Sequence, residues 1–278
     1  MPPTPNRVLT MKSIILKKGR EASLLRKHPW IFSGAIDRIK GSPGFGETVT
    51  VVDHKEQFLA QAAWSPQSQI QGRVWSFDPG ATIDREFFAD LIAKAINKRR
   101  LLLDNPNRSA CRLIYGESDH LPGLVVDRYN DFLVCQFLTA GMECWKQAIV
   151  ELLRSQLPCR GIYERSDVAS RRKEGLEETK GVLWGDTPPE TVIIQEFDYQ
   201  LAVDIAAGHK TGYYLDQAEN RRLAGTLSAG KTILNCFSYT GGFSVSALKG
   251  GAVHVTNVDS SAPALALAQQ NLERNGFA

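Results

Sequence analysis

The residues best suited to bind a ligand lie near the end of the chain, in a glycine loop and an acid that follows it. The loop contains Gly241 and Gly242; it follows the apolar run 231–236 and precedes a helical pattern of small residues. A second apolar run, 253–258, ends in Asp259. Two such runs predict neighbouring parallel strands, which place Asp259 beside the loop, within reach of a ribose.

The composition of this loop distinguishes between nucleotide ligands. A dinucleotide site needs G-x-G-x-x-G, because the pyrophosphate must approach backbone amides at a helix amino terminus. The sequence FSYTGGF lacks this spacing. S-adenosylmethionine has no phosphate, so its site needs only a tight turn and an acid for the ribose hydroxyls. The loop and Asp259 therefore favour S-adenosylmethionine over a nicotinamide cofactor. An ordinary strand, turn and helix without a ligand remains the alternative.

A second candidate segment is 203–222, VDIAAGHKTGYYLDQAENRR, where two glycines bracket a short polar turn. Such a loop can line the rim of a cofactor or substrate site. Lys210 and Arg221 suit a phosphate, whereas Asp204 or Asp216 suits the positively charged part of the cofactor. A plain surface turn explains the same composition equally well.

The positive charge of the chain is concentrated at its amino-terminal end. The first forty residues hold nine Lys or Arg and two acids, a balance of +7. Because the net charge of the whole chain is +3, the remaining residues carry −4. Cations beside aromatic rings suit RNA. The candidate RNA-binding residues are Lys17, Lys18, Arg20, Arg26, Lys27, His28 and Trp30. A solvated surface is the alternative for the charges, and for Phe32 we expect a place in the core.

Composition excludes several classes of protein. The 278 residues allow about two domains, and 43% hydrophobic with 23% charged residues is ordinary for a globular protein. No apolar run suits a membrane span, and MPPTPNRVLTMKS lacks the apolar centre of a signal peptide, so we expect a cytoplasmic protein without membrane contact. Five scattered cysteines without C-x-x-C indicate neither a disulfide framework nor a metal site.

Hydrophobic periodicity divides the chain into units that position these residues. From residue 13 to about 77, short strands alternate with turns, which predicts a small antiparallel barrel or sandwich, interrupted at 17–33 by a short helical pattern. Residues 84–104 show one amphipathic helix with a basic end. Strands around a helix at about 143–156 then predict an α+β unit. A polar loop or hairpin leads from it to the strand-rich segment 192–205.

Several motifs occur in one order along nearly the whole chain. They are HPWIFSGAI, GETVTVVD, RLIYGESDHLPGLVVDRY, YERSDVASRRKEG, VDIAAGHKTGYYLDQ and ILNCFSYTGGFSVSAL. In this order the chain resembles the PUA-containing large-subunit (23S) ribosomal RNA cytosine-5 methyltransferases. The resemblance implies a mixed α/β multidomain protein. It would have a PUA-like RNA-binding β-barrel at 1–82, a connector helix with a central α+β domain at 83–195, and a partial Rossmann-like methyltransferase domain at 196–278.

The resemblance also implies site residues, by matching positions. The cofactor motif falls on Asn235, Phe237, Ser238, Tyr239, Thr240, Gly241 and Gly242. The ribose acid falls on Asp259, and the preceding motif, 210–217, supplies Lys210, Thr211 and Asp216. Ribosomal RNA is the implied partner. The target nucleotide and the oligomeric state are left open, a homodimer included.

The chain departs from the family pattern in two ways. Ala218 stands where the family usually has an arginine after L-D-Q, which weakens one contact to cofactor or RNA. The family's later strands, its D-P-P-type motif and its cysteine nucleophile would lie beyond Ala278. We therefore expect no catalytic residue within the chain, and no turnover. Cys236 lies near the cofactor loop, but we expect it to be buried and structural rather than reactive.

The predicted activity is transfer of a methyl group from S-adenosylmethionine to cytosine C5 in ribosomal RNA. C5 is a poor nucleophile until a thiolate adds at C6, so the reaction needs an activated cysteine, an aligned methyl donor and a base. The target base must also leave its stack. A non-catalytic RNA-binding module with a vestigial cofactor domain is the main alternative, and a nicotinamide-dependent enzyme is a further one.

Overall fold

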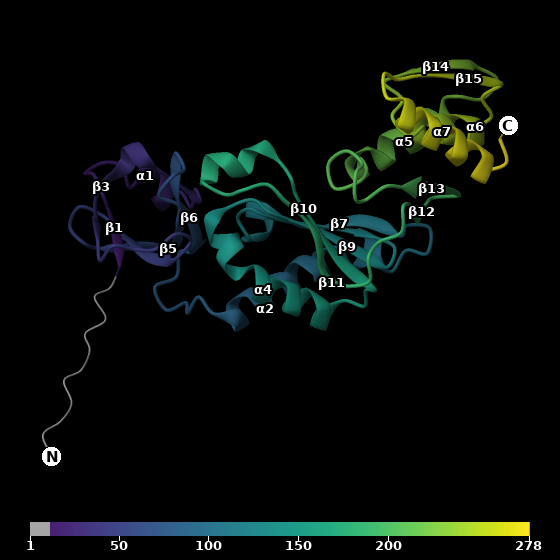
Figure 1. Cartoon of the computed structure of the whole chain (residues 1–278). Helices are drawn as coiled ribbons and strands as arrows, with labels where there is room; N and C mark the ends of the chain where they lie inside the picture. Colours follow the sequence, from purple (N-terminus) through teal and green to yellow (C-terminus); the bar gives the residue numbers. More distant parts are fainter. Residues whose placement is uncertain (1–11, 278) are drawn as a thin grey trace, which may run out of the picture.

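The computed structural model describes residues 12–277 as three units that follow one another along the chain (Figure 1). A β-barrel at one end is followed by a central sheet with two long helices, and a smaller α/β unit stands at the other end. Residues 1–11, most of the segment considered above for a signal peptide, and Ala278 lie outside the described residues. Within 12–277, no helix is both long and apolar enough to cross a bilayer.

The first unit is a six-stranded sheet in the order β2-β6-β5-β4-β1-β3. Only β1 and β4 pair in parallel, and buried aliphatic residues such as Ile14 and Val51 fill the interior. This arrangement confirms the predicted barrel. Its elements are β1 (Ser13–Leu16), α1 (Ala22–Leu25), β2 (Trp30–Phe32), η1 (Ser33–Ala35), β3 (Ile36–Lys40), β4 (Thr48–Val52), β5 (Phe58–Trp64) and β6 (Ile70–Ser76).

The single helix expected over 84–104 is two helices, α2 (Arg85–Lys98) and α3 (Arg100–Leu103). Asp84 begins α2 by accepting a hydrogen bond from the Phe87 backbone N–H at 2.9 Å. The helix ends at Arg99, whose guanidinium donates to the buried carboxylate of Asp119 at 2.6 Å. The periodicity of the sequence continues through this point, so only the tertiary contact identifies the break.

The second unit is a five-stranded sheet in the order β11-β10-β9-β8-β7. Helices α2 and α4 (Ala140–Gln156) cover one of its faces, where Phe88, Ile92 and Leu153 are fully buried. Strand β11 occupies part of the segment in which we expected a loop or hairpin. The remaining elements are β7 (Ala110–Tyr115), η2 (Gly116–Asp119), β8 (Leu124–Tyr129), β9 (Phe132–Phe137), β10 (Gly161–Ser166), η3 (Ala169–Glu174) and β11 (Thr179–Gly185).

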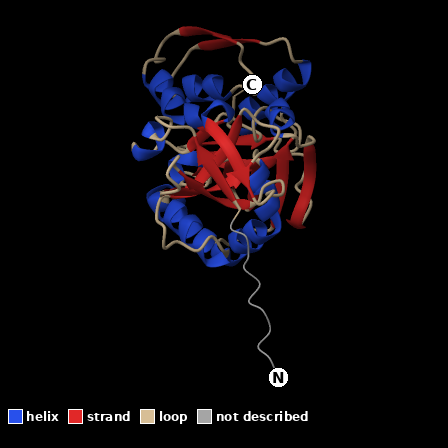
Figure 2. Ribbon diagram, turned by 90° about the vertical axis from the view of Figure 1, so that its left-hand side faces the viewer, coloured by secondary structure: helices blue, strands red, loops and turns tan. Residues whose placement is uncertain are grey.

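The third unit packs against the opposite face of the central sheet. Tyr129 and Val134 of that sheet share a core with Leu201 and Val245. In Figure 2 the strand pair β14–β15 lies beyond the helices of this unit, away from the central sheet. The elements are β12 (Val192–Glu196), β13 (Tyr199–Val203), η4 (Leu215–Gln217), α5 (Ala218–Thr226), β14 (Thr232–Cys236), α6 (Gly242–Lys249), β15 (His254–Val258) and α7 (Ala262–Arg274).

The strands β14 and β15 pair in parallel, as the sequence predicts. Side chains alternate along β14, so that Ile233 and Asn235 are partly covered while Leu234 and Cys236 are exposed. The expected burial of Cys236 is therefore wrong. Its position under the glycine loop is as expected, but the strand directs its side chain to the face without helices.

The barrel is attached to the central unit through buried polar groups. Glu174 of η3 accepts hydrogen bonds from Ser65 at 2.9 Å and Ser68 at 2.6 Å, and pairs with Arg73 at 2.8 Å. Burial lowers the pKa of Arg73, and the charge of Glu174 opposes that shift. Phe32 lies near this junction with 48% of its surface exposed, so its expected place in the core is wrong.

Replacement of Glu174 by Gln should destabilise the chain by about 3 kcal/mol, because Arg73 would remain buried without a counter-charge. The matched control is Glu178→Gln, whose partner Arg172 is 74% exposed and whose loss should cost less than about 1 kcal/mol. Urea denaturation measures both free energies. Equal effects of the two substitutions would contradict this role of Glu174.

Candidate cofactor site

A cleft of about 420 Å³ opens where β14 and β15 end side by side. Cys236 is paired with Val258 in the parallel register, so the loop after β14 and the acid after β15 meet at one edge. The 203–217 segment forms the opposite wall. The lining residues are His209, Tyr213, Tyr214, Gln217, Arg221, Phe237, Ser238, Tyr239, Gly242, Phe243, Asp259 and Ser260.

The loop after β14 has a strained backbone. Phe237 and Tyr239 have φ values of 57° and 48°, in the left-handed region that residues with a Cβ rarely adopt. Gly241, at 74°, adopts the same region without strain. The Asp259 carboxylate accepts a hydrogen bond from the Tyr239 backbone N–H at 2.8 Å. This bond supports the strained turn and fixes the carboxylate at the edge of the cleft.

Asp259 is held in its ionised form. Hydrogen bonds from the backbone of Ser261, at 2.9 Å, and of Tyr239 lower the pKa of the carboxyl below its usual value. The two carboxylate oxygens can together accept about four hydrogen bonds, so acceptor capacity remains for a ligand. A charged acceptor at this place suits the hydroxyls of a ribose.

Tyr239 connects the strained turn to the opposite wall. Its hydroxyl donates to the Gly212 carbonyl at 3.0 Å and accepts from the His209 backbone N–H at 2.9 Å. Its ring stacks on that of His209 at 4.6 Å between centroids. Burial raises the pKa of Tyr239, so the hydroxyl remains a neutral donor. The two walls of the cleft are therefore joined at this one side chain.

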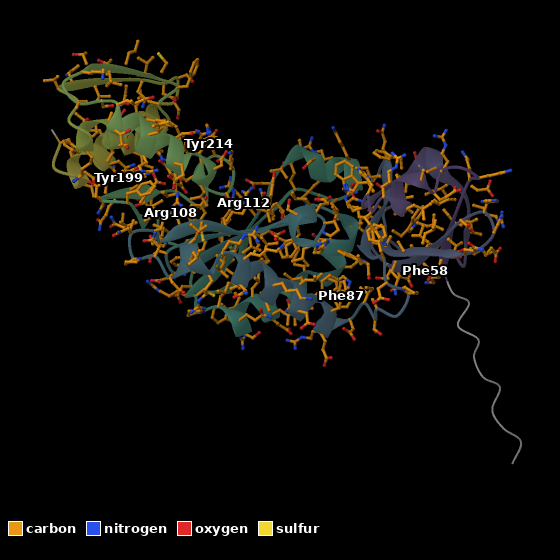
Figure 3. The ribbon with its side chains drawn as sticks, turned by 180° about the vertical axis from the view of Figure 1, so that it is seen from behind. Phe58, Phe87, Arg108, Arg112, Tyr199 and Tyr214 are labelled. Atoms are coloured by element: carbon orange, nitrogen blue, oxygen red, sulfur yellow. The ribbon has the colours of Figure 1, made fainter. Side chains whose placement is uncertain are left out.

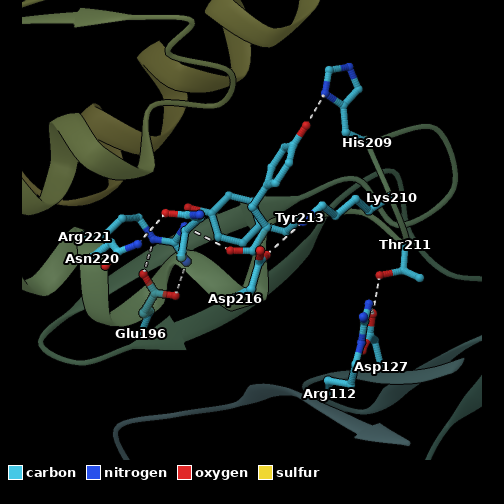
Figure 4. A network of polar contacts seen from close by, with 12 residues as sticks. Arg112, Asp127, Glu196, His209, Lys210, Thr211, Tyr213, Asp216, Asn220 and Arg221 are labelled. Carbon is cyan, nitrogen blue, oxygen red and sulfur yellow. Dashed lines mark hydrogen bonds and ion pairs between the residues drawn. The ribbon is translucent and has the colours of Figure 1, made fainter. Parts of the chain in front are cut away.

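Arg221 is a buried residue of the cleft lining, and its guanidinium is held by several contacts. It forms a bidentate pair with Glu196, at 2.6 and 2.7 Å, and its guanidinium lies 4.5 Å from the Tyr213 ring centroid (Figure 4). Burial lowers the pKa of Arg221, but the bond to Glu196 outweighs it and the net pKa is raised. The structure thus gives Arg221 a supporting role in place of the phosphate contact considered above.

The wall formed by 203–217 is anchored on the central sheet. Thr211 donates to the buried carboxylate of Asp127 at 2.5 Å, and Arg112 binds the same carboxylate at 2.8 and 2.9 Å (Figure 4). Arg165 of β10 donates to the Ile205 and Gly208 carbonyls, both at 3.0 Å. The cleft geometry therefore depends on side chains that are far away in the sequence.

The cleft contains buried hydroxyl groups whose missing hydrogen bonds a ligand can supply. The Ser238 and Tyr213 hydroxyls are buried and have no hydrogen-bond partner among the described residues. A Cβ at Gly242 would collide with the Tyr213 hydroxyl, so glycine is required for this close approach. A neutral ligand surface with hydroxyl and amino groups fits these features, and the adenosine part of S-adenosylmethionine has such groups.

The structure separates the predicted cofactor residues into two sets. Phe237, Ser238, Tyr239, Gly242 and Asp259 line the cleft. The others lie outside the lining. Of these, Asn235 bonds to Ser244 beneath the turn, at 2.8 Å, and Thr211 is buried against Asp127. Thr240 and Gly241 belong to the turn itself, and Lys210 pairs with Asp216 at 2.9 Å on the outer side of the wall.

Some residues of the cleft were not predicted as site residues. His209, Tyr213 and Tyr214 line it, and Glu196 with Asp127 supports it. The first three lie in a segment that the sequence singled out, so their aromatic character was an available signal. The sequence around Glu196 and Asp127 does not indicate a site, because only the tertiary fold brings these residues to the cleft.

Comparison with known proteins supports the same interpretation. Residues 14–77 match the PUA-like domain family, and residues 173–278 match the S-adenosylmethionine-dependent methyltransferase family. The chain is 52% identical over 266 residues to the ribosomal RNA large subunit methyltransferase I of Aeromonas hydrophila, covering 95% of this chain and 67% of that protein. The chain belongs to this methyltransferase family. Its cofactor is S-adenosylmethionine.

A second relative and a solved structure support the same family assignment. The ribosomal RNA large subunit methyltransferase I of Tolumonas auensis is 51% identical over 264 residues, covering 95% of this chain and 66% of that protein. The chain thus spans about two thirds of the length of these relatives. A solved structure in complex with SAH, 26% identical in sequence, superposes with a TM-score of 0.82 over 96% of this chain and 67% of its own.

Replacement of Asp259 by Asn should weaken S-adenosylmethionine binding by about tenfold or more, because a charged acceptor is lost from the cleft. Isothermal titration of the chain measures the dissociation constant. Asp186→Asn, at an exposed ion pair with Arg160, is the control and should bind as the unaltered chain does. An unchanged affinity in the Asp259 variant would remove this residue from the cofactor site.

Replacement of Gly242 by Ala tests the close approach of Tyr213. The added methyl group forces Tyr213 or the turn to move, and we expect about tenfold weaker cofactor binding with a stability loss of about 1–3 kcal/mol. Gly34→Ala is the control, because a Cβ there meets nothing within 4 Å. If titration showed full affinity in the Gly242 variant, the packing of Tyr213 on this glycine would not matter for the cofactor.

Proposed function

We propose that the protein methylates cytosine C5 in large-subunit ribosomal RNA. The observation that carries the proposal is the cleft in which Asp259, Ser238 and Gly242 meet the aromatic wall of the 203–217 segment. The names of the relatives, which are ribosomal RNA large subunit methyltransferases, support RNA as the substrate. The C5 position rests on the resemblance of the sequence motifs.

Residues of the cleft have distinct roles in this proposal. Asp259 accepts the ribose hydroxyls, and the Ser238 and Tyr213 hydroxyls bond to polar groups of the cofactor. Phe237, 92% exposed at the rim, presents a ring for stacking against a base. Bound S-adenosylmethionine supplies an electrophilic methyl group. The chain orients the donor, and backbone hydrogen bonds keep the Asp259 carboxylate ionised by lowering its pKa.

The barrel is the proposed first contact with RNA. Lys17, Lys18, Arg20, Arg26, Lys27 and His28 are all exposed, and Trp30 is half-buried. The Trp30 indole N–H donates to Glu117 of the central unit at 2.7 Å, so this aromatic side chain also joins the two units. A solvated basic surface of this kind binds phosphate groups without reading sequence.

No described cysteine lines the cleft, and the nucleophile for C6 is not assigned to any of them. Burial raises the pKa of Cys111 to about 11, and Cys135 is also buried with a raised pKa, so neither supplies a thiolate near neutral pH. Cys236 is exposed on the far face of β14. The family comparisons give no support to the expected inactivity of the chain.

Methylation assays test the proposal directly. The chain is incubated with S-adenosylmethionine labelled in its methyl group and an unmodified transcript of large-subunit ribosomal RNA, and the digested nucleosides are identified by mass spectrometry. Any nucleoside that becomes labelled should be 5-methylcytidine, and Asp259→Asn should lower its yield at limiting cofactor.

The outcomes separate the parts of the proposal. A labelled nucleoside other than 5-methylcytidine would overturn the C5 assignment and leave RNA methylation in place. Cofactor binding and salt-dependent RNA binding without any labelled product would favour the non-catalytic module, the alternative named above.

A further inference from the structure

A second, basic pocket lies beside the cofactor cleft, where the third unit meets the central sheet. Its volume is about 230 Å³, and Tyr213 lines both cavities. Figure 3 shows Arg108 and Arg112 at this junction, below Tyr214. The charged residues of its lining are four cations and one carboxylate: Arg99, Arg108, Arg112, Lys210 and Asp216.

Two of the cations form ion pairs with buried carboxylates, which fix their orientation. Arg99 binds Asp119 at 2.6 Å and Arg112 binds Asp127 at 2.8 Å, and both carboxylates are only 1% exposed. Arg112 uses two N–H groups in its bond to Asp127, whereas a guanidinium has five. Arg112 is 35% exposed. The pocket therefore contains fixed guanidinium groups with donors left for an anion.

The other two cations are paired with exposed carboxylates. Lys210 binds Asp216 at 2.9 Å, with exposed fractions of 42% and 61%. Arg108 binds Glu219 at 3.3 Å; the Arg108 side chain is 16% exposed and that of Glu219 is 59% exposed. The exposed Lys210–Asp216 pair contributes about 0–1 kcal/mol, so an incoming anion can replace the Asp216 carboxylate at small cost.

An exposed aromatic ring stands next to the same pocket. Tyr115, at the end of β7, is 55% exposed, and the Arg112 guanidinium lies 5.1 Å from its ring centroid. Fixed cations beside an open aromatic face are the combination that holds single-stranded nucleic acid, with phosphate on the cations and a base on the ring.

We propose that this pocket binds a backbone phosphate of the RNA substrate, with a neighbouring unpaired base stacked on Tyr115. The inference rests on the proposed function for the identity of the substrate. Because Tyr213 lines both the pocket and the cofactor cleft, a phosphate held here places the strand next to that cleft. The barrel then binds RNA in general, and this pocket binds the segment that approaches the cofactor.

The salt dependence of RNA binding tests the phosphate contact. Binding of a fluorescein-labelled single-stranded oligocytidylate is followed by anisotropy over a series of salt concentrations, for the unaltered chain, Arg108→Gln and Lys210→Gln. Each substitution should weaken binding about three- to tenfold at low salt and reduce the slope of log K against log salt by about 0.7. Arg160→Gln, at the exposed pair with Asp186, is the matched control and should leave the slope unchanged.

Tyr115→Leu separates stacking from charge. It should weaken binding without a change of slope, because no cation is removed. Thermal melting of each variant identifies unfolding, and Lys210→Gln, at a surface position, keeps the test valid if Arg108→Gln does not fold.

Three results would overturn the proposal: unchanged slopes in both pocket variants, an equal loss of RNA affinity in Arg160→Gln, or no RNA binding by the unaltered chain.

Thermal shifts with inorganic phosphate distinguish a free anion from RNA as the ligand of the pocket. Stabilisation by phosphate that Lys210→Gln abolishes, with unchanged RNA slopes, would assign the pocket to a free anion. Titration of the unaltered chain with S-adenosylmethionine tests the proposed function separately, since its failure would leave the slopes unaffected.

Discussion

The cofactor cleft depends on one buried carboxylate, that of Asp127 in the central sheet. It is fully buried and accepts hydrogen bonds from Arg112 and from Thr211 of the opposite unit. A buried charge is costly unless it is paired and hydrogen-bonded, so these three side chains must keep one arrangement. That arrangement places the loop carrying His209 and Tyr213 beside the turn after β14. The lining of the cleft consequently comes from the third unit, while the central sheet holds one of its walls in place.

The turn after β14 shows how a ligand site and a strained backbone support each other. Phe237 and Tyr239 have left-handed backbone conformations that cost about 1–3 kcal/mol each. Asp259 offsets part of this cost by accepting the Tyr239 backbone N–H, and the Tyr239 hydroxyl adds two bonds to the opposite wall. The same carboxylate that suits a ribose thus also maintains the shape of the turn.

The barrel and the third unit, which contains the cofactor cleft, lie at opposite ends of the central unit (Figure 1). Glu174 joins the barrel to this sheet, and Asp127 and Arg165 join the sheet to the cleft. All three contacts involve charged groups with little exposure, which hold a geometry more specifically than apolar packing does. The central sheet therefore relates the exposed basic surface of the barrel to the place where the methyl donor binds.

The sequence alone determined those features of the cofactor site that depend on residues close together along the chain. The strands 232–236 and 254–258, the glycine turn and Asp259 were predictable, because alternation, turn residues and a terminal acid are local signals. Tertiary structure decided the rest. The break at Arg99 coincides with its bond to the distant Asp119. The exposure of Cys236 and Phe32 depends on which face other units cover. The basic pocket gathers Arg99, Arg112 and Lys210 from distant segments. Contacts between residues far apart along the chain leave no periodic signal, and only the folded chain shows them.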